Sequence, residues 1–175
     1  MKIGFIGLGN VGGKLAGSLL RNEFNLTVID LDDSLVKDFI SKGSTTAKSP
    51  KELAEKVDLV ITCLPSPKIC SEVMEKKDGV IEGLSKNKIW LEMSTTDSKE
   101  VKRIGEFVKS KGAVPLDAPV SGGCHRAVTG NIAIFVGGER KSFEKILPVL
   151  TSMGRKILYT GELGSASILK VITNY

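Results

Sequence analysis

The stretch Gly7-Leu8-Gly9-Asn10-Val11-Gly12 decides how the rest of the sequence is interpreted, because its glycines fit the pattern G-x-G-x-x-G. It follows an apolar run at residues 2–6, which predicts a buried strand, and it opens residues 11–21, whose apolar positions repeat at helical spacing. A second apolar, β-branched run ends in Asp30, 23 residues after Gly7. A glycine turn between strand and helix, followed by an acid at the end of the next strand, is typical of dinucleotide-binding sites.

Each part of this pattern has an expected task. Gly7 is expected to make the tight turn, Gly9 to let the backbone approach a diphosphate, and Gly12 to let the helix pack on the strand. The helix N-terminus offers N–H groups and partial positive charge to the diphosphate, and Asp30 accepts hydrogen bonds from ribose hydroxyls. The cofactor-binding residues predicted here are Gly7, Leu8, Gly9, Asn10, Val11, Gly12 and Asp30. The alternative is a glycine turn that binds no ligand.

The residues after Asp30 bear on the choice between NAD and NADP. They are Leu31-Asp32-Asp33, so a 2′-phosphate would meet several carboxylates and no nearby arginine. This favours NAD as the cofactor. Lys37, one helical turn further on, keeps NADP open as the alternative.

Strand and helix patterns alternate along the whole chain. Further apolar runs predict strands at residues 58–63, 89–92, 113–116, 132–136 and 156–159, and the segments between them carry helix patterns, often with capping residues. The alternation predicts an α/β, Rossmann-like fold: a doubly wound, mostly parallel sheet with helices on both faces. Extra strands are expected between about Ala113 and Tyr159. Residues 165–175 begin a helix that no glycine or proline closes.

Composition agrees with a folded, water-soluble domain. The 175 residues include 41% apolar and 26% charged residues, with 25 Lys plus Arg against 20 Asp plus Glu, a formal charge of +5. This excludes a disordered chain, a collagen-like repeat and a disulfide-stabilised miniprotein. No apolar run is long enough to span a membrane, and no basic run resembles a nucleic-acid-binding arm. Three cysteines without zinc spacing and one histidine predict no metal site, reduced thiols and a cytoplasmic location.

Two other segments carry candidate chemistry. At Ser121-Gly122-Gly123 a hydroxyl and backbone N–H groups could hold a carboxylate, or the glycines could simply form a turn. Lys170 stands in an apolar stretch with Asn174 four residues on, so both share one helix face. Such a lysine extends to solvent in many proteins, but partial desolvation also suits it to proton transfer. His125 is expected to be a loop residue.

These pieces together resemble the β-hydroxyacid dehydrogenase family, which includes 3-hydroxyisobutyrate dehydrogenase and tartronate semialdehyde reductase. The N-terminal domain of 6-phosphogluconate dehydrogenase is a more distant relative. The resemblance covers essentially all of the chain, and it rests on four motifs in order. These are Gly4-Phe-Ile-Gly-Leu-Gly-Asn10, Leu64-Pro65, Ser94-Thr95 and Asp117-Ala-Pro-Val-Ser-Gly-Gly123, followed by the segment Gly164 to Asn174. Ala166, Thr173 and Ser98 depart from the family pattern and leave the subfamily open.

The resemblance implies a reversible hydride transfer between NAD(P) and a small β-hydroxyacid. Leu64, Pro65 and Thr95 would flank the cofactor, and Ser121, Gly122 and Gly123 would bind the substrate carboxylate. Lys170 would act as general acid or base, with Asn174 orienting substrate or lysine. Candidate substrates include 3-hydroxyisobutyrate, glycerate with tartronate semialdehyde, and 4-hydroxybutyrate.

The resemblance also implies a division of the chain. Residues 1–163 would form the dinucleotide-binding domain, and residues 164–175 would begin an interdomain helix. In the family a helical domain follows, which closes the active site and makes a homo-oligomer. Two other classes stay open: a non-catalytic cofactor-binding or oligomerisation module, and a nucleic-acid-associated protein.

Overall fold

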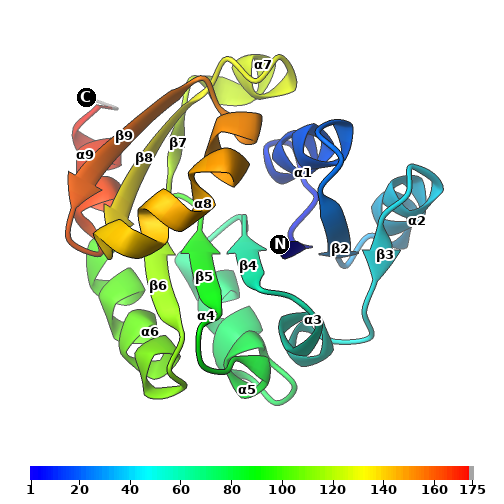
Figure 1. Ribbon diagram of the computed structural model, residues 1–175, viewed down its shortest axis with the longest axis horizontal. Helices are drawn as coiled ribbons and strands as arrows, with labels where there is room; N and C mark the ends of the chain where they lie inside the picture. The colour runs from blue at the N-terminus through cyan, green and yellow to red at the C-terminus, as the bar shows by residue number, and fades with distance from the viewer. Residues whose placement is uncertain (174–175) are drawn as a thin grey trace.

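Figure 1 shows the computed structural model, which describes residues 1–173 and, at Cys124, the backbone alone. The strands are β1 (Lys2–Ile6), β2 (Asn25–Ile29), β3 (Thr45–Thr46), β4 (Leu59–Thr62), β5 (Ile89–Glu92), β6 (Val114–Asp117), β7 (Val120–Ser121), β8 (Ala133–Gly138) and β9 (Lys156–Gly161). The helices are α1 (Gly12–Arg21), α2 (Asp33–Ser41), α3 (Pro50–Lys56), α4 (Pro67–Glu75), α5 (Val80–Gly83), α6 (Ser98–Ser110), α7 (Gly123–Val128), α8 (Arg140–Met153) and α9 (Ser165–Ile172).

One twisted sheet carries the fold, with its strands in the order β3-β2-β1-β4-β5-β6-β8-β7 and β9 paired to β8. All pairs from β3 to β6 are parallel, as the alternating pattern predicts. The chain leaves β1 on one side through β2 and β3 and returns on the other side through β4. The direction of the winding therefore reverses between β1 and β4, and in folds of this type ligands bind at the carboxyl ends of the strands beside such a reversal.

The central strands are buried on both faces, because their alternate side chains enter two separate cores. Ile3, Phe5 and Leu91 join the core under α1, α2 and α8, whereas Val60 and Trp90 join the core under α3, α4 and α6. The period-2 alternation of a strand divides the side chains in this way. Helices therefore cover both faces of the sheet, which confirms the predicted doubly wound α/β class.

The C-terminal strands add an antiparallel extension to the parallel sheet. β8 runs antiparallel to β6 and β7, and β9 runs parallel to β8. The extra strands predicted after Ala113 are thus present. His125, expected in a loop, lies instead on the short helix α7.

None of the described helices is both long and apolar enough to cross a membrane. Within residues 1–173, apart from the Cys124 side chain, no three His, Cys, Asp or Glu side chains are placed to share a metal ion.

Candidate active site

Two glycines of the loop between β1 and α1 are required by the fold itself. Gly7 has a φ of +101°, and a Cβ there would lie 2.2 Å from the carbonyl oxygen of Cys63. A Cβ at Gly12 would lie 2.0 Å from the carbonyl oxygen of Gly7. The tight turn and the close packing of α1 on the sheet thus explain these two glycines without any ligand.

Within residues 1–173, neither backbone conformation nor packing requires a glycine at position 9. Its φ lies outside the left-handed region, and a Cβ there would meet no atom within 4 Å. In the described part of the chain the N–H groups of Gly9, Asn10, Val11 and Gly12 have no acceptor, and α1 begins without a side-chain cap. Open N–H groups over open space at a helix N-terminus fit an anionic group such as a diphosphate.

The Asp30 carboxylate follows β2 and faces the glycine loop. It accepts hydrogen bonds from the N–H of Leu8 at 2.6 Å and from the N–H of Asp32 at 2.9 Å. The Leu8 side chain is buried, so Leu8 takes part in the loop through its backbone. Asp30 is half-buried, and each carboxylate oxygen keeps a lone pair for a further donor such as a hydroxyl.

A second carboxylate strengthens the negative charge beyond β2. Asp32 caps α2 by accepting from the N–H of Ser34 at 2.9 Å and from its hydroxyl at 2.5 Å. These hydrogen bonds hold the pKa of Asp32 below its ordinary value, so this exposed carboxyl is ionised at neutral pH. Asp33 follows in the first turn of α2. Three acidic side chains thus stand between the end of β2 and the first turn of α2.

The ends of β4 and β5 lie beside the glycine loop and are tied to each other. The N–H of Leu64 donates to the hydroxyl of Ser94 at 2.8 Å, and Leu64 Cδ2 lies 3.1 Å from the position of a Cβ on Gly7. Ser94 is buried, whereas Pro65 and Thr95 are exposed. Ser94 thus holds the two strand ends together, and Pro65 and Thr95 are solvent-accessible next to them.

A buried acid that the sequence did not single out underlies this junction. Glu92 is fully buried and accepts from Thr62 at 2.8 Å, from the thiol of Cys70 at 2.6 Å and from the N–H of Ser94 at 2.6 Å. The buried Trp90 donates its indole N–H to the Thr62 hydroxyl at 2.9 Å. Burial raises the pKa of Glu92, although its hydrogen bonds act in the opposite direction, and burial likewise raises the pKa of Cys70. Cys70 is therefore a neutral packing thiol.

Replacement of Glu92 by glutamine tests this pKa shift. Because the pKa is raised above its ordinary value near 4.5, the folded protein keeps this proton to higher pH than the unfolded chain does. The stability contributed by Glu92 is fully present below that value and is lost as the pH rises through the folded pKa. We expect the free energy of unfolding of the native protein, relative to Glu92→Gln, to fall across this range in urea titrations.

Glu52 provides a control of opposite sign. Hydrogen bonds from Lys56 and from the N–H of Lys48 lower the pKa of Glu52. The stability contributed by Glu52 is therefore present above its ordinary pKa and lost as the pH falls through the folded one. Relative to Glu52→Gln, the native protein should thus gain stability with rising pH. Parallel stability curves for the native protein and Glu92→Gln would refute the raised pKa.

The predicted carboxylate-binding turn is a strand end followed by a helix. β7 ends at Ser121, and α7 begins at Gly123. Gly122 and Gly123 have φ values of +129° and +72°, which favour glycine. A Cβ on Gly123 would meet nothing within 4 Å, and both glycines are exposed. The need for a turn is sufficient to explain why these two residues are glycines. Because the surface here is open, the backbone is also accessible to a ligand.

Lys170 is half-buried on α9, a helix that packs against β8, β9 and β6. Asn174, the second predicted catalytic residue, lies outside the described residues. α9 is tied to β6 through Asp117, the first residue of the segment that leads to Ser121. Direct contacts join the glycine loop to Asp30 and Leu64, and the contacts of Asp117 with α9 relate the helix of Lys170 to the segment that leads to Ser121.

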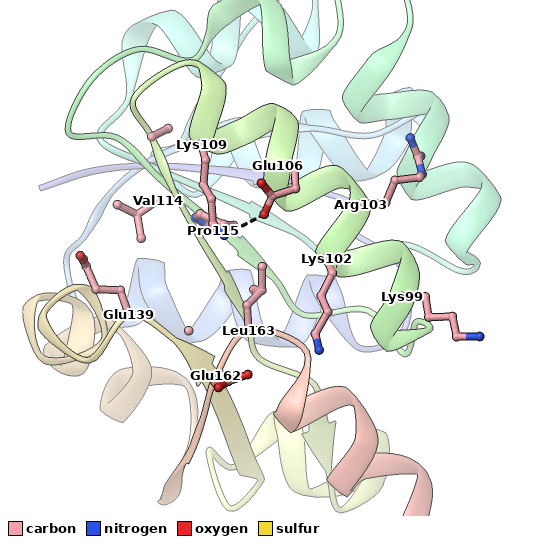
Figure 2. A pocket seen from close by; sticks show the side chains of 12 residues that line it. Lys99, Lys102, Arg103, Glu106, Lys109, Val114, Pro115, Glu139, Glu162 and Leu163 are labelled. Atoms are coloured by element: carbon pink, nitrogen blue, oxygen red, sulfur yellow. Dashed lines mark hydrogen bonds and ion pairs between the residues drawn. The ribbon is translucent and has the colours of Figure 1, made fainter.

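Hollows in the surface do not by themselves mark the site. One of about 690 Å³ borders Leu8, Gly9 and Asn10, between α1 and α2. A larger one of about 930 Å³ lies between α6 and the residue pairs 138–139 and 162–163 (Figure 2). Its charged lining consists of Lys99, Lys102, Arg103, Glu106, Lys109, Glu139 and Glu162. Since ligands of such folds bind at the carboxyl ends of the strands, the glycine loop is the better candidate.

Comparison with known proteins identifies the family of the chain. Residues 2–161 match the family model described as the NAD-binding domain of 6-phosphogluconate dehydrogenase. The chain is 37% identical over 172 residues to the mitochondrial 3-hydroxyisobutyrate dehydrogenase of Rattus norvegicus, which covers 98% of this chain and 51% of that protein. The chain thus spans about half the length of the curated relatives it matches.

Solved structures show the same fold with bound ligands. Psf3 in complex with NADP+ and 2-OPP superposes with a TM-score of 0.93 at 25% identity, over 98% of this chain and 61% of that one. The 3-hydroxyisobutyrate dehydrogenase of Mycobacterium tuberculosis, solved with L-serine, superposes with a TM-score of 0.90 at 27% identity, over 99% of this chain and 58% of that one. The chain therefore belongs to the family of the NAD-binding domain of 6-phosphogluconate dehydrogenase.

Proposed function

We propose that the protein containing this chain is an NAD(P)-dependent oxidoreductase that interconverts a small β-hydroxyacid and its semialdehyde or keto acid. The observation that carries the proposal is the space above Gly9, edged by the open N–H groups of residues 9–12. The fold does not require a glycine at position 9, whereas a dinucleotide bound close to the backbone would require one. The half-buried Asp30 beside the same loop fits the ribose of such a cofactor.

The residues of the chain divide the proposed reaction between them. The Ser121 hydroxyl and the N–H groups of Gly122 and Gly123 hold the substrate carboxylate. When bound, the nicotinamide supplies or accepts the hydride at the hydroxyl-bearing carbon. Lys170 Nζ takes the hydroxyl proton during oxidation and returns it during reduction. Asn174 is proposed to orient the substrate or the lysine.

We propose NAD rather than NADP as the preferred cofactor, because Asp30, Asp32 and Asp33 would repel a 2′-phosphate. Calorimetric titration should give a lower Kd for NADH than for NADPH. Asp32→Ala, which removes one exposed carboxylate of this cluster, should narrow that difference in affinity and leave NADH affinity nearly unchanged. Equal affinities in the native protein, or tighter NADPH binding, would contradict the proposed role of the acidic cluster.

The substrate class is tested by initial rates on a panel of hydroxyacids. We propose activity on at least one of 3-hydroxyisobutyrate, L-serine, glycerate and 4-hydroxybutyrate, each of which has a carboxylate and an oxidisable hydroxyl. Binding of NADH without turnover of any of these would instead favour a non-catalytic cofactor-binding module. Turnover of an uncharged alcohol at the same rate would argue against a carboxylate site at Ser121.

We also propose a reducing, cytoplasmic location and a homo-oligomeric assembly. The buried Cys70 keeps its thiol, which donates to Glu92 at 2.6 Å, and a retained thiol supports a reducing compartment. Cell fractionation and light scattering on the intact protein test the two statements separately.

A further inference from the structure

The first turn of α9 depends on a carboxylate from another part of the chain. Its N-cap residue, Gly164, has a φ of +86° and provides no side-chain cap. Instead, the Asp117 carboxylate at the end of β6 accepts from the N–H of Gly164 at 2.8 Å and from the N–H of Ser167 at 2.8 Å. It also accepts from the Ser167 hydroxyl at 2.9 Å. Three donors that belong to α9 thus converge on one side chain of the sheet.

The surroundings of Asp117 are built tightly around this contact. Asp117 is fully buried, and a Cβ on Gly137 of β8 would lie 2.5 Å from its Oδ1. On the other side of the turn, Leu163 packs against α6, where a Cβ on Gly105 would lie 2.6 Å from Leu163 Cδ2. Figure 2 shows Leu163 beside Pro115 at this junction. The carboxylate and the start of the helix are thus closely packed against β8 and α6.

The sheet geometry relates the contact between Asp117 and α9 to two parts of the proposed site, Ser121 and Lys170, which lie far apart in sequence. β8 pairs Ala133 with Ser121 and Gly137 with Asp117, so it runs from the level of Ser121 to that of Asp117. β9 follows β8 in the same direction, and α9 then turns back (Figure 1). Helix α9 therefore runs from Asp117 toward the Ser121 end of the sheet, with Lys170 in its second half.

We propose that Asp117 is a positioning residue, which fixes the height and rotation of α9 and thereby places Lys170 relative to the substrate segment that Asp117 itself begins. This inference rests on the proposed role of Lys170 in proton transfer. A helix held at its first turn by three hydrogen bonds to one rigid strand carries its later side chains to defined positions.

Asp117→Asn tests the inference in the intact protein. The amide keeps one acceptor oxygen and turns an NH₂ group toward donors, so it cannot satisfy all three contacts. We expect kcat to fall about 100-fold, as for a misplaced catalytic group, with the Kd for NADH unchanged. In the Lys170→Ala background the same substitution should lower kcat no further, because the group that Asp117 positions is already gone.

Two further variants keep the test decisive. Ser167→Ala removes only the hydroxyl donor and should lower kcat by about threefold to tenfold, again only while Lys170 is present. Ser167→Ala therefore still tests the positioning role if the Asp117→Asn variant does not fold. Ser49→Ala removes the cap of α3 and is the control for lost helix capping: it should lower the melting temperature and leave kcat unchanged.

The outcomes separate the inference from the proposed function. If Lys170→Ala loses turnover while Asp117→Asn and Ser167→Ala keep native kcat, the positioning role is wrong and the lysine assignment stands. If the losses from Asp117→Asn and Lys170→Ala multiply in the double variant, Asp117 acts on stability or on another group, and the inference is likewise overturned. If Lys170→Ala keeps native turnover, the proposed lysine role itself fails.

Discussion

Replacement of Lys170 by alanine is expected to lower kcat about 10²–10⁴-fold, the usual contribution of a general acid or base. The Kd for NADH should not change, because the cofactor contacts proposed here come from residues 7–12, Asp30 and the ends of β4 and β5. Steady-state rates with a hydroxyacid substrate, combined with calorimetric titration of NADH, measure the two quantities separately.

Lys88 provides a matched control for this experiment. It is half-buried like Lys170, but it immediately precedes β5, at the amino end of this strand, and donates to the backbone carbonyls of Ala54 and Glu55. Lys88→Ala should lower stability and leave kcat unchanged. Native turnover in Lys170→Ala, or an equal loss in both variants, would remove Lys170 from the proposed mechanism.

Replacement of Gly9 by valine is expected to raise the Kd for NADH at least about 100-fold, or about 2.8 kcal/mol. The new side chain would occupy the space above the open N–H groups, where the diphosphate is proposed to bind. The melting temperature should change little, because a Cβ at Gly9 meets no atom of the described chain within 4 Å.

Two other glycines of the same region separate binding from folding. Gly12→Ala should destabilise the fold, because its Cβ would lie 2.0 Å from the carbonyl oxygen of Gly7. Gly17→Val, two turns along α1 from the loop, meets only the flexible end of Arg21 and should leave NADH affinity unchanged. Native affinity in Gly9→Val would show that the diphosphate does not bind at this loop.

Local pattern was sufficient for the parts of the structure that depend on neighbouring residues. The glycine loop, the long helices and the buried strands follow from spacing and capping. At α3, for example, Ser49 caps the helix, Pro50 is its first residue, and the N–H of Glu52 donates to the Ser49 hydroxyl. The two-residue strands β3 and β7 escaped prediction because they are too short to show a period. Helix α7 begins with a glycine in a left-handed conformation, which sequence alone indicates as a turn.

The polar junctions could not be predicted, because their partners are distant in sequence. Asp30, Glu92 and Asp117 all stand at or just after the end of an apolar strand, so their local patterns are alike. In the structure Asp30 is half-buried beside an open loop, Glu92 is covered by Cys70 of α4, and Asp117 is covered by α9. Only the tertiary packing distinguishes a residue that can face a ligand from one that holds the framework.

A crystal structure of the protein with NADH bound tests the central claim most directly. We expect diphosphate oxygens within hydrogen-bond distance, about 2.7–3.2 Å, of N–H groups in residues 9–12, and a ribose hydroxyl donating to Asp30. A dinucleotide seated elsewhere, for example in the charged hollow beside α6, with the N–H groups of residues 9–12 left unoccupied, would contradict it.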